Sequence, residues 1–184
     1  MRAFLAMELN EYVKDNIQKT QNLLSDTNAA DLKNVEYENI HMTVKFFGDI
    51  NERKTKQITK IINNTTCDYK PYTMKVSKIG AFPNTRKARV IWTKAGDKNN
   101  TTIDLIQNLD EQFSKIGFNK EHSYKPHITL SRVKRIHDNE LLQDTLDEIK
   151  NSYYGKVNVD RILLKSSTLT PEGPQYKTEK EFIL

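Results

Sequence analysis

Residues 40–46 read IHMTVKF, a stretch in which apolar and polar side chains alternate. Successive side chains of a β-strand point to opposite faces of its sheet, so the alternation predicts a strand with one buried face. The residues expected to face the core are Ile40, Met42, Val44 and Phe46. His41, Thr43 and Lys45 then share the opposite face, and a face this polar on a central strand indicates a solvated groove.

The same pattern returns at residues 126–132, which read PHITLSR. The inward residues are Ile128 and Leu130, and the residues of the polar face are His127, Thr129 and Ser131. Arg132 is out of phase with His127. It can reach the same face only if the strand ends, twists or bulges at this point.

The rest of the chain alternates between helical and strand-like periodicity. Apolar residues at helical spacing predict four helices, whose stripes begin at Val13, Ile58, Ile103 and Leu141. The first stripe consists of Val13, Ile17, Thr20 and Leu24. Asp110 interrupts the third stripe, and Gly117 is expected to end that helix. The predicted strands include residues 2–9, 40–48, 73–82, 88–94, 126–133, 156–167 and 176–183, with a turn at 171–174 between the last two.

The order of these segments divides the chain into two similar halves, each with one His-x-Thr tripeptide. The two histidines lie 86 residues apart, close to half of the 184 residues, which indicates an internal duplication. We therefore expect an α+β fold with two mainly antiparallel sheets and helices on their outer faces. The whole chain, residues 1–184, would form one domain built from two halves.

Composition excludes several classes of protein. The net charge of +5 favours partners that carry phosphate, without identifying them. Cys67 is the only cysteine, which excludes an intramolecular disulfide and a zinc cluster of thiolates, and the six glycines form no phosphate-binding loop. Glu8 interrupts the first apolar run too early for a signal peptide, and no run approaches the roughly 18 apolar residues of a transmembrane helix. We expect a soluble cytoplasmic protein without a cofactor.

The two tripeptides supply the groups that hydrolysis of a phosphate ester requires. Histidine titrates near neutral pH, so one imidazole can take a proton from water while the other gives a proton to the leaving oxygen. Thr43 and Thr129 can donate hydrogen bonds to the phosphate oxygens on which charge builds, and Arg132 would add a permanent positive charge. This apparatus needs no metal. Spacing does not say which histidine is the acid, and either tripeptide could also be a strand with exposed polar residues.

Together with their flanking residues, the tripeptides resemble the signature of the 2H phosphoesterase superfamily. Within it, the chain is similar to the RNA 2′,3′-cyclic phosphodiesterases, historically called 2′-5′ RNA ligases. The segments that carry the resemblance are residues 2–4, 38–48, 80–83, 89–92, 127–132 and 165–176. Ser131 is a departure, because similar sequences often have glycine there, and a serine could restrict the bend that Arg132 needs.

The resemblance implies a bilobal fold with pseudo-twofold symmetry and a central cleft that holds both tripeptides. It further implies that His41 is the general acid, that His127 is the general base, and that Arg132 binds phosphate. The substrate would be RNA with a 2′,3′-cyclic phosphate end, such as a tRNA half, or a cyclic nucleotide, and the product would end in a 2′-phosphate. Two alternatives stay open: reversible 2′-5′ ligation of RNA, and a non-catalytic module that binds RNA or nucleotides. At this size we expect a monomer.

Several other side chains near the tripeptides have more than one interpretation. Phe47 and Tyr124 could stack on a base, whereas Trp92 is expected in the core. Lys45 either attracts phosphate or solvates the rim of the groove. The two remaining histidines, expected at the surface, are His122 and His137.

Overall fold

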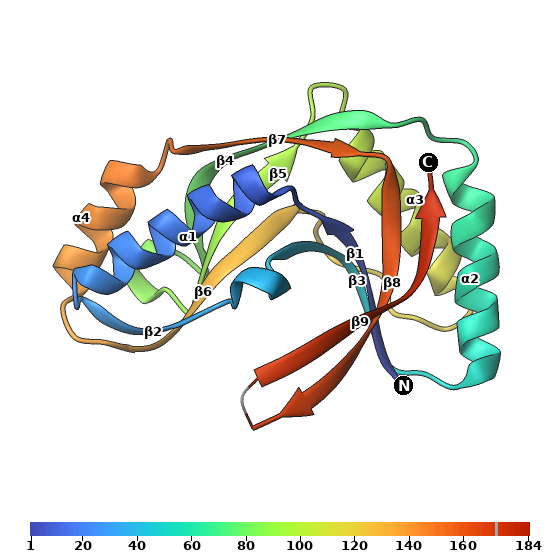
Figure 1. Ribbon diagram of the computed structural model, residues 1–184, viewed down its shortest axis with the longest axis horizontal. Coiled ribbons are helices and arrows are strands. Elements are labelled where there is room, and N and C mark those ends of the chain that lie inside the picture. The colour runs from blue at the N-terminus through green and yellow to red at the C-terminus, as the bar shows by residue number, and fades with distance from the viewer. Residues whose placement is uncertain (172) are drawn as a thin grey trace.

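The computed structural model describes residues 1–171 and 173–184 and has an α+β fold (Figure 1). Its α-helices are α1 (Glu11–Asp26), α2 (Glu52–Thr66), α3 (Thr101–Ser114) and α4 (Asn139–Ile149). Its strands are β1 (Arg2–Glu8), β2 (Ala30–Asn34), β3 (His41–Asp49), β4 (Tyr72–Phe82), β5 (Val90–Gly96), β6 (His127–Ile136), β7 (Tyr153–Val159), β8 (Arg161–Thr170) and β9 (Gly173–Ile183). Two short 3-10 helices are η1 (Tyr37–Asn39) and η2 (Thr85–Lys87).

The strands form one continuous antiparallel sheet in the order β7-β4-β5-β6-β3-β1-β8-β9, with β2 paired to β6. The two sheets expected from the sequence are therefore joined, and the prediction of separate sheets is wrong. The junction between β3 and β6 is short, because Met42 and Ile128 form its one registered pair in the described part of the chain. Each strand with a His-x-Thr thus lies at the centre of the sheet, next to the other.

The four predicted helices are confirmed, but not every residue of the predicted stripes is buried. Leu141, with which the fourth stripe begins, is 41% exposed. In α1 the core-facing residue is Gln21, which is 3% exposed, and not Thr20. Thr20 instead makes a hydrogen bond with the hydroxyl of Tyr154. α3 ends at Ser114, before the predicted stop at Gly117. Helical periodicity was sufficient to locate the helices, because each helix buries one face against the sheet.

The predicted strands are confirmed with two exceptions. The segment 156–167 falls into two strands, β7 and β8, which separate at Asp160. β2 was not predicted, because it has only five residues, of which only Ala30 and Leu32 are apolar. The predicted turn at residues 171–174 includes Glu172, which lies outside the described residues.

The helices cover the two ends of the sheet, with α1 and α4 at one end and α2 and α3 at the other (Figure 1). The larger core cluster packs α2, α3 and the first part of α1 against the sheet, through residues such as Ile17, Ile58 and Phe113. A smaller cluster lies beneath α4 and the end of α1, around Leu24 and Leu142. Burial of each such side chain contributes about 1.5–3 kcal/mol, so these clusters hold the helices in place.

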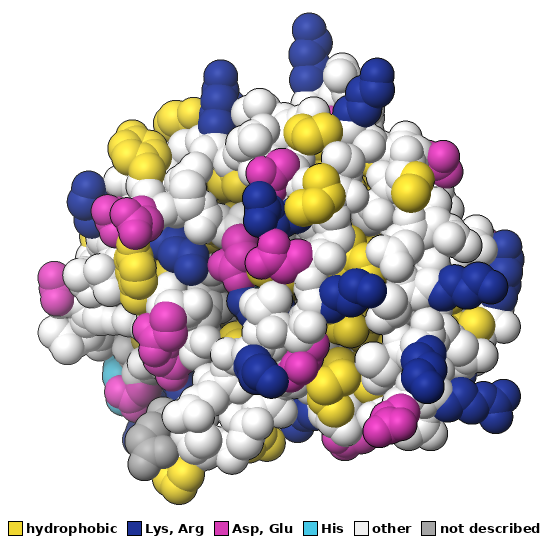
Figure 2. All heavy atoms as spheres, turned by 45° about the vertical axis from the view of Figure 1, so that its right-hand side comes forward, with side chains coloured by type: hydrophobic (Ala, Val, Ile, Leu, Met, Phe, Trp, Pro, Cys, Tyr) yellow, Lys and Arg dark blue, Asp and Glu magenta, His cyan; other side chains and the backbone are white. Residues whose placement is uncertain are grey.

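The surface mixes charges of both signs. Figure 2 shows one face, on which Lys and Arg side chains are interspersed with Asp and Glu and with small apolar patches. The net charge of +5 is therefore not gathered into a single band on this face. Among the described residues, no helix is both long enough and apolar enough to cross a membrane.

Candidate active site

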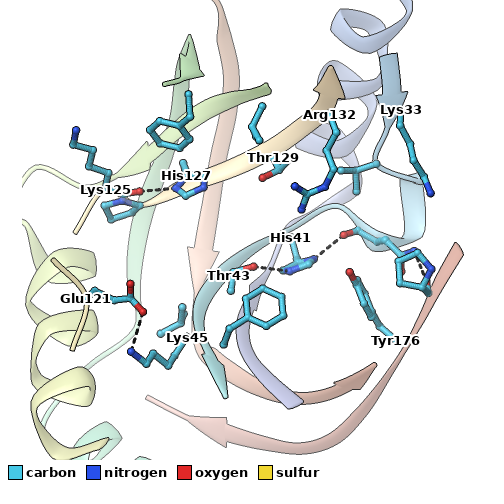
Figure 3. Close-up of a pocket in the computed structure, with 18 of the residues that line it drawn as sticks. Lys33, His41, Thr43, Lys45, Glu121, Lys125, His127, Thr129, Arg132 and Tyr176 are labelled. Atoms are coloured by element: carbon cyan, nitrogen blue, oxygen red, sulfur yellow. Dashed lines mark hydrogen bonds and ion pairs between the residues drawn. The ribbon is translucent and has the colours of Figure 1, made fainter. Parts of the chain in front are cut away.

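A groove of about 670 Å³ opens where β3 and β6 lie side by side at the centre of the sheet. All of the residues predicted for the site line it, namely His41, Thr43, His127, Thr129 and Arg132. Figure 3 shows these side chains directed into a common space from the two strands. The fold thus gathers the two distant tripeptides into one site.

Strand β3 bulges directly after its His-x-Thr. Thr43 and Lys45 lie opposite neighbouring residues of β1, so Val44 is an extra residue on β3. A second irregularity comes next, and together they break the alternation of two on which the prediction rested. Phe46 is 55% exposed, not buried, while Phe47 is 7% exposed in the core. The prediction of Phe46 as a core residue is therefore wrong, and Phe47 is not available to stack on a base.

Lys45 lines the groove, but its ammonium group is paired with two carboxylates. Its side chain is 5% exposed, and its Nζ lies 2.7 Å from Oδ1 of Asp110 on α3 and 2.8 Å from Oε1 of Glu121. Oδ2 of the same Asp110 accepts a hydrogen bond of 2.8 Å from the Tyr124 hydroxyl. The two interpretations of Lys45 from the sequence, attraction of phosphate or solvation of the rim, both assumed an exposed charge, whereas this charge is buried and paired. Its partner Asp110 is the residue that interrupts the predicted apolar stripe.

Strand β6 bulges at the equivalent position. Thr129 and Ser131 lie opposite neighbouring residues of β5, so Leu130 is the extra residue. Arg132 then lies opposite Val90, two residues from the β5 partner of Thr129, and both side chains share one face. The bulge resolves the phase problem of Arg132 and brings it to the groove with the second tripeptide.

Hydrogen bonds from neighbouring segments stabilise the bulge in β6. The side-chain amide of Gln21 donates a hydrogen bond of 2.8 Å to the carbonyl oxygen of Leu130, which also accepts one of 2.9 Å from the Val35 amide. The hydroxyl of Ser131 donates to Oδ1 of Asn34 at 2.7 Å. Ser131 is fully buried, so this serine supports the bend of β6 and does not obstruct it.

Both imidazole rings are oriented by a backbone carbonyl group two residues earlier in the chain. His41 Nδ1 lies 2.7 Å from the oxygen of Asn39, and His127 Nδ1 lies 2.7 Å from the oxygen of Lys125. A carbonyl oxygen only accepts hydrogen bonds, so Nδ1 carries the hydrogen in each ring. Nε2 is then the atom that can exchange a proton in the groove. His41 Nε2 also lies 2.9 Å from Oγ1 of Thr43.

The environment of His41 disfavours its charged form. Its ring packs against Phe4 and Tyr176, with ring centroids 5.1 and 5.5 Å apart. Burial lowers the pKa of His41, although the hydrogen bond to the Asn39 carbonyl acts in the opposite direction. In the free protein at neutral pH His41 is thus mainly neutral.

His127 has a similar pair of aromatic neighbours, Phe82 and Trp92, at 5.1 and 6.1 Å. Trp92, which was predicted to lie in the core, is only half-buried. Its ring also lies against Gly80 of β4, where an added Cβ would come within 2.4 Å of it. The sequence showed neither Phe82 nor Tyr176 as a neighbour of the histidines, because both come from strands remote in the chain.

The end of the groove beside β2 is basic. Lys33 pairs in register with Arg132, and Lys134 also lines the groove. Sequence reasoning missed Lys33 because it missed β2. Among residues 1–171 and 173–184, no group of three or more His, Cys, Asp or Glu side chains is placed to hold a metal ion.

The family described as LigT-like phosphoesterase matches residues 8–92 and 96–176, which include both tripeptides and make up more than half of the chain. The chain belongs to this family. The resemblance to 2H phosphoesterases that the paired tripeptides indicated is thereby confirmed.

Two relatives match this LigT-like phosphoesterase over its full length. The RNA 2′,3′-cyclic phosphodiesterase of Methanothermobacter thermautotrophicus is 39% identical over 185 residues, covering 100% of this chain and 99% of the relative. The protein of the same name from Methanocaldococcus jannaschii is 39% identical over 182 residues, covering 99% and 100%.

A solved structure supports the fold of the LigT-like phosphoesterase independently of close sequence identity. A protein of Thermus thermophilus superimposes with a TM-score of 0.83 at 23% identity, covering 100% of this chain and 98% of that protein. At this identity the likeness concerns the fold alone.

Proposed function

We propose that this LigT-like phosphoesterase hydrolyses the 2′,3′-cyclic phosphate end of RNA to a 2′-phosphate end. The observation that carries the proposal is the pair of oriented imidazoles, each with Nδ1 held by a carbonyl and with Nε2 as the atom left to exchange a proton in one groove, that of His41 beside the Thr43 hydroxyl. The names of the two full-length relatives support the choice of substrate.

In the proposed reaction, His127 Nε2 removes a proton from a water molecule as the water oxygen attacks phosphorus. The bond between phosphorus and the 3′ oxygen breaks, and His41 Nε2 gives its proton to that oxygen. Thr43, Thr129 and Arg132 stabilise the charge that builds on the nonbridging oxygens. The division into acid and base rests on the family resemblance, since the shared geometry of the two rings would serve either role.

The lowered pKa of His41 bears directly on its role as the acid. A general acid must be protonated when the leaving group departs, whereas burial keeps His41 mainly neutral in the free protein. The phosphate of the bound substrate is an anion, and a negative charge next to an imidazole raises its pKa. We infer that substrate binding favours the protonated form of His41, so that His41 can act as an acid only when a phosphate occupies the groove.

RNA, in preference to a small cyclic nucleotide, is favoured by the basic end of the groove. Lys33 and Lys134 accompany Arg132 there, more cationic groups than one cyclic phosphate needs. Phosphates further along an RNA strand would interact with them. One chain supplies both histidines, so we propose that it acts as a monomer, and we keep the cytoplasm as its predicted location.

The groove consists of two half-sites, each formed by one tripeptide and its surroundings. Their similarity also supports the duplication predicted from the sequence. Each half has a bulge after the tripeptide, a carbonyl acceptor two residues before the histidine, and two aromatic rings around the imidazole. We propose that the two halves of the chain descend from one ancestral half, so that the site is bilobal.

The proposal is tested by a product assay on an RNA oligonucleotide with a defined 2′,3′-cyclic phosphate end. We expect a 2′-phosphate product, formed at the same rate with and without EDTA. A 3′-phosphate product, or a requirement for a metal, would contradict the proposed mechanism. Adding a second strand with a 5′-hydroxyl tests ligation, and dominant joined product at modest RNA concentration would make ligation the main activity. Binding of the RNA without turnover would indicate a non-catalytic module.

A further inference from the structure

The proposed reaction does not use the buried ion pair between Lys45 on β3 and Asp110 on α3. The two side chains are 5% and 2% exposed, and their charged atoms lie 2.7 Å apart. Burial alone would lower the pKa of Lys45 and raise that of Asp110, but the hydrogen bonds and opposite charges reverse both effects, so both groups stay ionised. Burying two charges is costly, and a buried pair is weak as a source of stability. The role of this pair therefore has to lie in the groups that it contacts.

The pair holds the irregular segment that leads from α3 to the second tripeptide. Lys45 Nζ donates a hydrogen bond of 2.6 Å to the carbonyl oxygen of Asn119. Oδ2 of Asp110 accepts one of 2.9 Å from the Glu121 amide and one of 2.8 Å from the Tyr124 hydroxyl. Residues 119–126 belong to no helix or strand, so these side chains replace the hydrogen bonds that regular structure would provide.

The same segment determines the state of His127. The Tyr124 hydroxyl is fixed by Asp110, and the next residue, Lys125, provides the carbonyl oxygen that accepts the His127 Nδ1 hydrogen at 2.7 Å. Figure 3 shows the link between Lys45 and Glu121 and the link between Lys125 and His127. If the segment moves, His127 loses the acceptor that directs its Nε2 into the groove.

We propose that Lys45 and Asp110 are positioning residues for His127, and that Lys45 couples the two half-sites because its own strand carries His41. This inference rests on the proposed function for the role of His127. It makes the tautomer of one catalytic histidine depend on a side chain from the strand of the other.

The test compares histidine-ring ¹⁵N spectra, which distinguish the two tautomers, with the turnover of cyclic-ended RNA. Lys45→Met leaves Asp110 buried without a partner and can impair folding. The decisive variant is therefore the double substitution Lys45→Met with Asp110→Leu, which removes both charges but still deprives the segment of its hydrogen bonds. Lys54→Met is the matched control, because Lys54 Nζ also donates to a backbone carbonyl near the end of α3, that of Ile116.

In the double variant we expect His127 to populate both neutral tautomers while His41 keeps its hydrogen on Nδ1. We expect kcat to fall about 10- to 100-fold, as a misplaced catalytic group causes, with a much smaller change in KM. The control should match the unaltered protein in both measurements. A fall in kcat with an unchanged His127 tautomer, an equal change in both histidines, or no change at all would overturn the inference. Failure of the proposed function is distinguishable, because the unaltered protein would then leave cyclic-ended RNA unhydrolysed, or His127→Ala would hydrolyse it at the full rate, whatever tautomer the ¹⁵N spectra show.

Discussion

The two half-sites share a backbone plan but differ in the residues directly after the bulge. In β3 the extra residue is followed by Lys45 and Phe46, whereas in β6 it is followed by Ser131 and Arg132. The first half therefore buries its cation in an ion pair with Asp110 and presents an aromatic ring to the groove. The second half buries a hydroxyl and presents a guanidinium group.

Both imidazoles are oriented by a backbone carbonyl in the same way, so the two rings differ in their neighbours. The proposed roles of acid and base would depend on these neighbours. His41 Nε2 contacts a threonine hydroxyl at 2.9 Å, and burial lowers its pKa. His127 instead shares its strand with Arg132, whose charge would hold the phosphate close to the attacking water. Substitutions in one half at a time test whether the two histidines differ in this way.

The largest effect is expected from removing either imidazole. His41→Ala and His127→Ala should each lower kcat by about 10²- to 10⁴-fold, the range for loss of a general acid or base, with RNA binding largely retained. A substrate in which sulfur replaces the 3′ leaving oxygen needs no proton from an acid. It should restore turnover to His41→Ala and not to His127→Ala. Restoration of both variants, or of His127→Ala alone, would contradict the assignment of roles.

The threonines should come next. Thr43→Val and Thr129→Val each remove one hydrogen-bond donor to the phosphate, and a preorganised donor of this kind contributes about 10²-fold or more to kcat. Thr→Ser at the same positions keeps the hydroxyl and should recover most of the rate in single-turnover measurements. If Val and Ser variants are equally slow, the hydroxyls act through packing and the proposed role is wrong.

A smaller loss is expected from Arg132→Ala, which removes a cation from one half only. A hydrogen bond to a charged group is worth about 1.5–3 kcal/mol, so kcat/KM should fall about 10- to 100-fold. The slope of log affinity for RNA against log salt should decrease by about one charge. Arg135→Ala, on the same strand but outside the groove lining, is the control. An equal loss in both variants would mean that only net charge matters.

The smallest effect concerns the pH dependence of stability. Because burial lowers the pKa of His41, the unfolded chain binds more protons than the folded protein between that lowered pKa and the ordinary histidine value. Stability should therefore rise with pH across this window and be lost as pH falls through it, by at most about 1.4 kcal/mol per pH unit. Urea unfolding of His41→Gln should show a flatter pH dependence than that of the unaltered chain. Identical slopes would mean that burial of His41 does not shift its titration.

The sequence predicted the features that depend on periodicity within one element. The four helical stripes, the strands of the two tripeptides and the pairing of His41 with Thr43 and of His127 with Thr129 all result from local spacing. The bulge in β3 could not be placed and the one in β6 was only one of several ways to bring Arg132 into phase, because an extra residue is a property of the pairing between strands. Because the pairing of β3 is irregular, Phe46 is exposed and Phe47 is buried, the reverse of the expected order.

Contacts between segments that are remote in the chain could not be predicted from local spacing, and only one of them left a partial signal in the sequence. Asp110 was visible as a polar residue in an apolar stripe, and Lys45 as a cation in a strand, but nothing local joined them. Gln21 gave no signal, since its partner is the carbonyl oxygen of Leu130 and backbone atoms have no identity in a sequence. Lys33 was not predicted as a groove residue because its strand, β2, was not predicted. β2 is short and mostly polar, as loops often are.

The short junction of β3 and β6 gives two core residues an unexpected importance. Met42 and Ile128, the registered pair of that junction, are fully buried and lie directly between each histidine and its threonine in the chain. With so little backbone pairing at the junction, side-chain volume on the hidden side of the sheet sets how far apart the two histidine-bearing strands lie. The width of the groove is thus determined in the hydrophobic interior, and an enzyme of this kind can be tuned to its substrate without altering a residue that touches it.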